Sequence, residues 1–276
     1  MRTIDAASPA HVATLDTDGL REAFLAEDLF VPGRVSAAYL LSDRIAVVGA
    51  VPLDEGLRLP TYDQLRSETF LQRREAGVLN LGGAGAVTVD GERYELATTG
   101  SLYVGRGARE VVFTSDDADD PAAFYLFSAT AHLDLPTTLV TPEAMNVVEI
   151  GSEDDANRRT LHQCIYEGGT RSAQIAFGFT TVHRGSVWNT MPAHTHARRT
   201  ECYLYFDLAP QDRVFHVMGE PSQTRHLVVA DRTFVFSPPW SLHTGVGTGP
   251  YSFVWATAGE NTTYDDMDAV PVTRMR

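Results

Sequence analysis

The chain has 276 residues and a formal net charge of -14, with 36 acidic residues against 22 basic ones, all of them Arg. Because Lys is absent, Schiff-base aldolases, pyridoxal-phosphate enzymes, P-loop nucleotidases and protein kinases are excluded, since each needs a lysine amine. The acidic balance argues against a nucleic-acid partner, which would need a clustered cationic face. Cys164 and Cys202 lie far apart, so no disulfide framework is expected.

We expect no targeting signal at the start of the chain. Its first twenty residues lack the apolar core of a signal peptide, and no later apolar run approaches membrane-spanning length. We therefore expect a cytoplasmic protein with no membrane partner. The length suits either two ordinary domains or one large β-rich unit.

Two early segments have apolar residues at helical spacing. In residues 18–30 the apolar positions include Leu20, Phe24 and Leu29, with Asp18 expected as the N-terminal cap. Residues 62–74 are the second helical candidate.

Alternating apolar and polar residues predict strands in most of the remaining chain. The stretch 78–96 breaks at Asp90 and Gly91, a pair typical of tight hairpin turns. Gly-rich residues 82–85 resemble the start of a dinucleotide-binding loop, but a strand follows them, so a tight bend is expected. The other predicted strands are residues 101–104, 110–114, 123–129, 173–183, 201–208, 213–218, 226–229, 233–236 and 251–257.

Residues 135–159 have the composition of a loop, rich in Pro, Thr, Gly and acidic residues. We place a boundary here and predict two domains, residues 1–150 and 151–276. The two halves share a similar order of turns and hairpins, which suggests a duplicated fold. Short strands at this spacing indicate an all-β protein, with a sandwich or barrel in each half and a few short helices.

A His-x-His pair followed by an acid is the strongest chemical signal. Residues i and i+2 of a strand point to one side, so His194 and His196 can direct two imidazoles at one point. Glu201 follows five residues later, and His243 comes just after a predicted strand, in a Pro-rich turn. Three neutral imidazoles and a carboxylate suit a divalent transition metal with open positions for substrate. Unrelated core or surface histidines are the alternative interpretation.

The strand that begins at Glu201 can line a cavity beside these residues. Tyr203, Tyr205 and Asp207 alternate with it along one side, so they are candidates for moving a proton. Ordinary lining of a barrel interior is the alternative for all three.

Several motifs together resemble one family of metal-binding cupins. The second half has the cupin order of a His-x-His pair, an acid and a later histidine. Segments 188–199, 219–226, 237–248 and 259–268 are similar to the 5-keto-4-deoxyuronate isomerase family. Residues 15–21 and 77–85 extend the resemblance to the first half, so it covers nearly the whole chain.

The resemblance implies a two-lobed cupin of β-barrel or jelly-roll halves, assembled as a homohexamer. It implies Zn²⁺ held by His194, His196, Glu201 and His243. It also implies a ketol-isomerase that converts the sugar acid 5-keto-4-deoxyuronate to 3-deoxy-D-glycero-2,5-hexodiulosonate in pectin degradation. One metal per chain is expected, because the first 135 residues contain only two histidines.

The carboxylate of such a substrate needs Arg or backbone amides, since the chain has no Lys. Arg225 is the first candidate for binding this carboxylate, and four other arginines are further candidates. For all five, a surface ion pair is the alternative role. The other four are Arg158, Arg159, Arg198 and Arg199. An Fe(II)-dependent cupin dioxygenase and a non-catalytic sugar-binding cupin are the rival functions. Metal content, oxygen uptake and product formation distinguish them.

Overall fold

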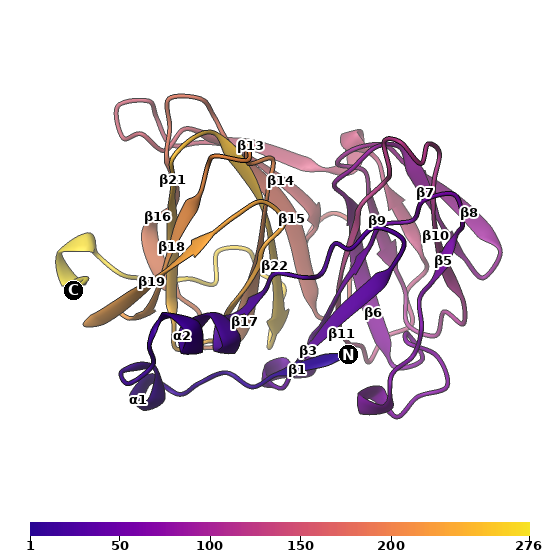
Figure 1. Cartoon of the computed structure of the whole chain (residues 1–276), viewed down its shortest axis with the longest axis horizontal. Helices are drawn as coiled ribbons and strands as arrows, with labels where there is room; N and C mark the ends of the chain where they lie inside the picture. The colour runs from indigo at the N-terminus through magenta and orange to yellow at the C-terminus, as the bar shows by residue number, and fades with distance from the viewer. The chain divides into compact units, whose positions relative to one another are not determined.

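The computed structural model describes all residues from 1 to 276 and divides the chain into two compact units. The first contains Met1–Thr3, Asp28–Met145 and Cys164–Ala176, and the second contains Ile4–Glu27, Asn146–Gln163 and Phe177–Arg276. Each unit is built around two antiparallel sheets with few helices, so the expected all-β class is confirmed (Figure 1). The assignment of residues 1–150 and 151–276 to one domain each stays a prediction. Each compact unit combines segments from different parts of the chain.

The first unit has a seven-stranded and a four-stranded sheet. The order of the larger sheet is β1 (Arg2–Ile4), β3 (Val35–Leu40), β4 (Ala46–Ala50), β11 (Phe124–Thr130), β6 (Arg74–Asn80), β9 (Ser101–Val104) and β12 (Thr138–Val140). The smaller sheet contains β5 (Leu57–Arg58), β10 (Val111–Ser115), β7 (Gly85–Val89) and β8 (Glu92–Leu96). Apolar side chains from both sheets, among them Val48, Val87 and Phe113, form one hydrophobic core.

The predicted hairpin and bend of the first unit are confirmed. Asp90 and Gly91 join β7 to β8 with φ angles of 49° and 91°, which Asp and Gly adopt more readily than other residues. In the bend at 82–85, a Cβ on Gly83 would lie 2.0 Å from the carbonyl oxygen of Asp120. Only glycine fits such a close approach of two backbones.

The second unit contains a seven-stranded and a five-stranded sheet that face each other (Figure 1). The order of the larger sheet is β13 (Asn146–Ile150), β14 (Arg159–Ile165), β15 (Ile175–Val182), β22 (Tyr251–Gly259), β17 (Arg199–Phe206), β20 (Phe234–Ser237) and β2 (Leu25–Ala26). The smaller has β19 (Gln223–Val229), β18 (Val214–Glu220), β21 (Leu242–Gly247), β16 (Trp188–Thr195) and β23 (Asp268–Ala269). The predicted strands are confirmed with shifted ends, and residues 135–159 also contain β12 and β13.

Helices are short, and the first prediction needs a correction. The cap of α2 (Thr17–Phe24) is Asp16, not Asp18, because the Asp16 carboxylate accepts the Gly19 N–H at 2.8 Å. The helix ends early, since Leu25 is extended and pairs with β20. The others are α1 (Pro9–Val12) and the 3-10 turns η1 (Ser42–Arg44), η2 (Asp63–Leu65), η3 (Pro142–Ala144) and η4 (Val272–Arg274). None has the length and apolarity to cross a bilayer.

The predicted helix over residues 62–74 is wrong. Only η2 forms there, and it ends at Arg66, whose φ of 47° is left-handed. Phe70 and Leu71 are buried in the core of the first unit, and Arg74 begins β6. Packing of these side chains against the sheets therefore overrides their helical spacing.

Candidate metal centre

The four predicted ligands come from both sheets of the second unit. His194 of β16 and His243 of β21 are directly paired across neighbouring strands. His196 follows the end of β16, while Glu201 lies in β17 of the other sheet. One ligand atom from each side chain lies within 4.8 Å of the others, and their exposed fractions are only 9%, 2%, 7% and 1% in chain order. His243, expected after a strand, is instead the second residue of β21.

The strand that carries His194 is irregular just before it. The register between β16 and β21 shifts between Asn189 and His194, and Thr190 has a φ of 48°. The hydroxyl of Thr190 is hydrogen bonded to that of Tyr203 at 3.0 Å, which ties this stretch to β17. Such bulges are common beside active sites, because they change the direction of the following side chains.

Three of four distances between ligand atoms of the group are close to those around one metal ion, and the fourth is shorter. Nε2 of His194 lies 3.0 Å from Nε2 of His196 and 3.0 Å from Nε2 of His243. Oε2 of Glu201 lies 2.6 Å from His196 Nε2 and 3.2 Å from His243 Nε2. Atoms bound at about 2.1 Å in adjacent positions of one ion are themselves about 3 Å apart. The group can therefore hold a metal ion.

Hydrogen bonds behind the ligands orient their rings. Nδ1 of His196 is 2.5 Å from the carbonyl oxygen of Asp266, which can only accept, so Nδ1 carries the proton. If His196 is neutral, its Nε2 has no proton, and the lone pair of Nε2 faces the Glu201 carboxylate. The two groups repel each other unless a cation lies between them. Nδ1 of His243 is 3.0 Å from the hydroxyl of Ser237. These contacts leave both Nε2 atoms for a metal.

We expect Ser237→Ala to weaken metal binding about 10- to 100-fold without removing a ligand, because outer partners of metal-binding histidines typically have effects of this size. Competition with a chelator measures the affinity. Ser252→Ala is the control, since Ser252 is equally buried but bonds to Thr181 on the other side of β22. Equal metal affinity of the Ser237 variant and the control would show that this hydroxyl does not orient His243.

Burial and mutual proximity set the charges of the group. Burial, helped by His243, lowers the pKa of His194 to about 3, and burial also lowers the pKa of His243. Burial alone would raise the pKa of Glu201, but His243 and His196 outweigh it and hold this pKa well below its usual value. An ionised carboxylate beside neutral imidazoles is the state in which these side chains bind metals.

The structure separates the three candidates that follow Glu201 in the chain. Tyr203 and Tyr205 are buried on its side of β17, and the Tyr203 ring lies 5.4 Å from that of His243. Burial raises the pKa of both tyrosines well above the usual value, so both phenols stay protonated and can donate hydrogen bonds. Asp207 does not share this buried environment. It lies beyond β17, is exposed and has a φ of 59°, which breaks the alternation of the strand.

A polar network occupies the interior next to the ligand group. The Tyr205 hydroxyl is 2.8 Å from Nδ1 of His216, and the Asn189 side chain donates to the Tyr251 hydroxyl at 2.9 Å. A Cβ on Gly245 would lie 2.9 Å from the Tyr205 hydroxyl, so the glycine makes room for this network. The interior next to the ligand group is therefore polar and aromatic.

Arg225 is in register with His243 across the smaller sheet of the second unit. It pairs with Met218 of β18, which in turn pairs with His243. Directly paired residues project to one side of a sheet, so the Arg225 side chain starts on the ligand side. Its guanidinium donates to the carbonyl oxygens of Thr224 and Ala13 and pairs with no carboxylate.

The other arginines have different surroundings. Arg198 and Arg158 form surface ion pairs, with Asp266 and Asp268 and with Glu153 respectively. Arg159 and Arg199 are buried and donate to backbone carbonyl oxygens.

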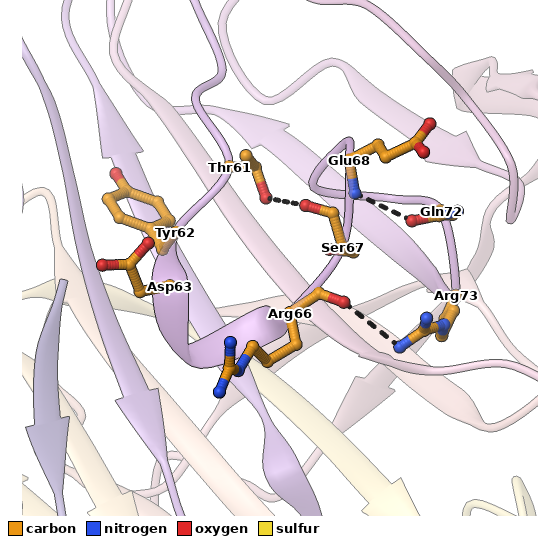
Figure 2. Close-up of a pocket in the computed structure, with 8 residues that line it drawn as sticks. All are labelled: Thr61, Tyr62, Asp63, Arg66, Ser67, Glu68, Gln72 and Arg73. Carbon is orange, nitrogen blue, oxygen red and sulfur yellow. Dashed lines mark hydrogen bonds between the residues drawn. The ribbon is translucent and has the colours of Figure 1, made fainter.

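A separate pocket of about 420 Å³ lies on the first unit, beside the turn that replaces the predicted helix. Its lining is Thr61, Tyr62, Asp63, Arg66, Ser67, Glu68, Gln72 and Arg73 (Figure 2). Arg73 donates to the Arg66 carbonyl oxygen at 3.4 Å, and the Glu68 N–H donates to Gln72 at 2.9 Å. These bonds hold the turn together, and we assign no chemistry to this pocket.

The fold is that of a cupin, and its buried ligand group is one that can hold a metal ion. An IolB-like protein from Salmonella typhimurium aligns with a TM-score of 0.73 at 16% identity, over 90% of this chain and 96% of that one. Oxalate decarboxylase from Lactobacillus farciminis aligns with a TM-score of 0.55 at 11% identity, over 79% and 78%. The expected two-lobed cupin fold is confirmed.

The chain belongs to the KduI/IolB family, whose pattern matches residues 41–271. The 4-deoxy-L-threo-5-hexosulose-uronate ketol-isomerase of Kineococcus radiotolerans is 54% identical over 274 residues, covering 98% of each chain. The protein of the same name from Lachnoclostridium phytofermentans is 48% identical over 271 residues, again covering 98% of each. The family resemblance is thus confirmed, and the protein is an enzyme of the ketol-isomerase class.

Proposed function

We propose that the protein interconverts 4-deoxy-L-threo-5-hexosulose uronate, which is 5-keto-4-deoxyuronate, and 3-deoxy-D-glycero-2,5-hexodiulosonate. The observation that carries the proposal is the convergence of three imidazoles and one carboxylate in a chain so similar to ketol-isomerases named for this sugar acid. We propose one Zn²⁺ per chain, held by His194, His196, Glu201 and His243. Zinc suits nitrogen and oxygen ligands and a reaction that needs no change of metal oxidation state.

Moving the carbonyl from C1 to C2 requires loss of the C2 proton, while negative charge develops on the two neighbouring oxygens. A bound divalent ion supplies stabilisation of that charge as a Lewis acid. The two sugar acids are isomers, so the protons lost from C2 and its hydroxyl are balanced by protons gained at C1 and its oxygen. Tyr203 lies near the ligands, and burial raises the pKa of its phenol, so it stays protonated and can donate a hydrogen bond to the developing charge. The hydroxyl of Tyr205 is hydrogen bonded to His216, which holds both side chains in place beside Tyr203.

We propose Arg225 as the partner of the substrate carboxylate. Arg225→Ala is expected to raise KM for the uronate about 10- to 100-fold with unchanged metal content, because a charge-assisted hydrogen bond is lost. Arg225→Lys should recover part of the loss, since it keeps the charge but not the planar fork. Arg158→Ala, which breaks only a surface ion pair, is the control. A KM equal to that of the control would assign the carboxylate to another residue.

Elemental analysis together with an assay of the uronate tests the proposed function. We expect zinc in the purified protein and conversion of the uronate, followed by NMR, without oxygen consumption. Iron with oxygen uptake would instead indicate the dioxygenase. Tight binding of the uronate with no product would indicate a sugar-binding cupin.

The family resemblance also supports three wider proposals: a homohexamer, a cytoplasmic location and a role in pectin degradation. Light scattering of the purified protein tests the first of these. The proposed binding partner is a small sugar acid, the substrate itself. The absence of a nucleic-acid partner stays a prediction.

A further inference from the structure

A segment of eight residues crosses between the two sheets of the second unit beside the ligands. β22 ends at Gly259 in the larger sheet, and β23 begins at Asp268 in the smaller one. Asp268 pairs with Thr195, and the next residue pairs with His194. Residues 260–267, which we call the strap, therefore pass over the end of the unit at which the metal ligands lie.

Side chains from β17 and β22 hold the strap in place. The Arg199 guanidinium donates to the carbonyl oxygens of Thr263 and Tyr264, the latter at 3.1 Å. The Tyr264 ring packs edge-on against Trp255, with ring centres 5.3 Å apart. The carbonyl oxygen of Asp266 accepts from the ligand His196. The strap is thus attached both to a metal ligand and to the interior wall next to it.

Three buried hydrogen-bond donors on β17 and β22, the strands that hold the strap, have no partner. They are Nε of Arg199, Nε1 of Trp255 and the hydroxyl of Thr257, on residues that are each more than nine-tenths buried. Buried polar groups are almost always paired in native proteins, because leaving them unpaired costs free energy. Three such donors on adjacent strands point to a ligand that supplies acceptors.

The strand register places these donors next to the metal ligands. Thr257 pairs directly with Glu201, and Trp255 pairs with Tyr203, so all four side chains project to the interior. The Trp255 indole lies across Gly178 of β15, where a Cβ would be 2.4 Å from the ring. A residue with a side chain at position 178 would clash with the indole, so glycine is needed there.

We infer that Arg199, Trp255 and Thr257 form the subsite that binds the oxygens of the substrate, and that the strap covers it. The identity of the ligand, a sugar acid, rests on the proposed function. A sugar acid carries acceptor oxygens along its chain, and the two β22 positions are about 7 Å apart, close to the length of a six-carbon chain. Because the three donors are covered, the strap moves outward to admit the ligand.

The decisive variant is Thr257→Val, which replaces the hydroxyl with a methyl group of the same shape. We expect kcat/KM for the uronate to fall about 10- to 100-fold at unchanged metal content, because a hydrogen bond to the ligand is lost. In the ligand-free protein the melting temperature should stay equal or rise by about 1–3 °C, since a buried unpaired hydroxyl is removed. A purely structural role for the hydroxyl predicts the opposite sign of this shift.

Two further variants and a control complete the experiment. Thr257→Ser should restore activity, and Trp255→Phe, which keeps a ring but removes the N–H, should lower kcat/KM like Thr257→Val. Thr181→Val is the control, because Thr181 bonds to Ser252 on the other side of the sheet. Normal kinetics of Thr257→Val, or a lowered melting temperature of its ligand-free form, would overturn the inference.

Calorimetric titration with the same uronate separates this inference from the proposed function. If the wild-type protein binds the uronate without converting it, the function fails, and weaker binding by Thr257→Val still supports the subsite. If the wild-type protein converts the uronate and Thr257→Val matches it, the subsite fails and the function stands. A wild-type protein that neither binds nor converts the uronate contradicts both.

Discussion

His194→Ala is expected to abolish metal binding and turnover together. The substitution removes one of three imidazoles whose Nε2 atoms converge with the Glu201 carboxylate. Loss of metal removes several kcal/mol of stabilisation of the developing charge, so kcat/KM should fall about a thousandfold or more. Elemental analysis and the uronate assay measure the two effects on the same sample.

The control for this variant is His226→Ala, which removes an exposed histidine of β19 that belongs to no ligand group. Circular dichroism establishes that both variants are folded. Turnover at the wild-type rate by metal-free His194→Ala would falsify the proposal of a metal-dependent reaction. Retention of metal with normal affinity would show instead that His194 is not a ligand.

Glu75→Ala is expected to cause the largest loss of stability. This carboxylate is fully buried in β6 of the first unit and accepts four hydrogen bonds. Its oxygens bind the Tyr103 hydroxyl and the Ala173 N–H at 2.7 Å each, the Gln174 N–H at 2.7 Å and the Ile175 N–H at 3.1 Å. Alanine leaves four donors without their partner, two of them on buried residues and two on half-buried ones, so we expect a loss of about 3–5 kcal/mol. That corresponds to a fall in melting temperature of about 10 °C.

Smaller changes at the same place should have graded effects. Glu75→Gln keeps the size and one acceptor oxygen, and Tyr103→Phe removes only one donor, so each should cost less than the alanine variant. Glu95→Ala, at an exposed position of β8, should leave the melting temperature within about 1 °C. If Glu75→Ala melts like the Glu95 variant, the carboxylate does not anchor residues 173–175.

Features that depend on near neighbours in the chain were predictable. Alternation located most strands, and the pair Asp90 and Gly91 located a hairpin, because side-chain direction and turn geometry are local properties. The His-x-His spacing identified two candidate ligands for the same reason. Residues 62–74 were predicted wrongly, because burial of Phe70 and Leu71 against the sheets outweighs the helical spacing of the apolar residues there.

Other parts of the site had no local signal. Asp207 shares the alternation of Tyr203 and Tyr205, yet a positive φ beyond the end of β17 turns it outward. Trp255, Thr257 and Tyr264 have no spacing that relates them to the ligands, although residues 259–268 belong to a motif of the family resemblance. The role of Glu75 had no local signal either, because three of its four partners lie about a hundred residues away in the chain.

The sequence by itself determined the all-β class and the four ligand candidates from residue types and their order, and its motifs resemble the cupin family. The tertiary structure alone decided that Glu201 faces two histidine-bearing strands, that Thr257 lies opposite Glu201 and that residues 260–267 cross beside them. The physical reason is strand register. Pairing between strands distant in the chain is set by the packing of whole sheets, and no short stretch of sequence specifies it.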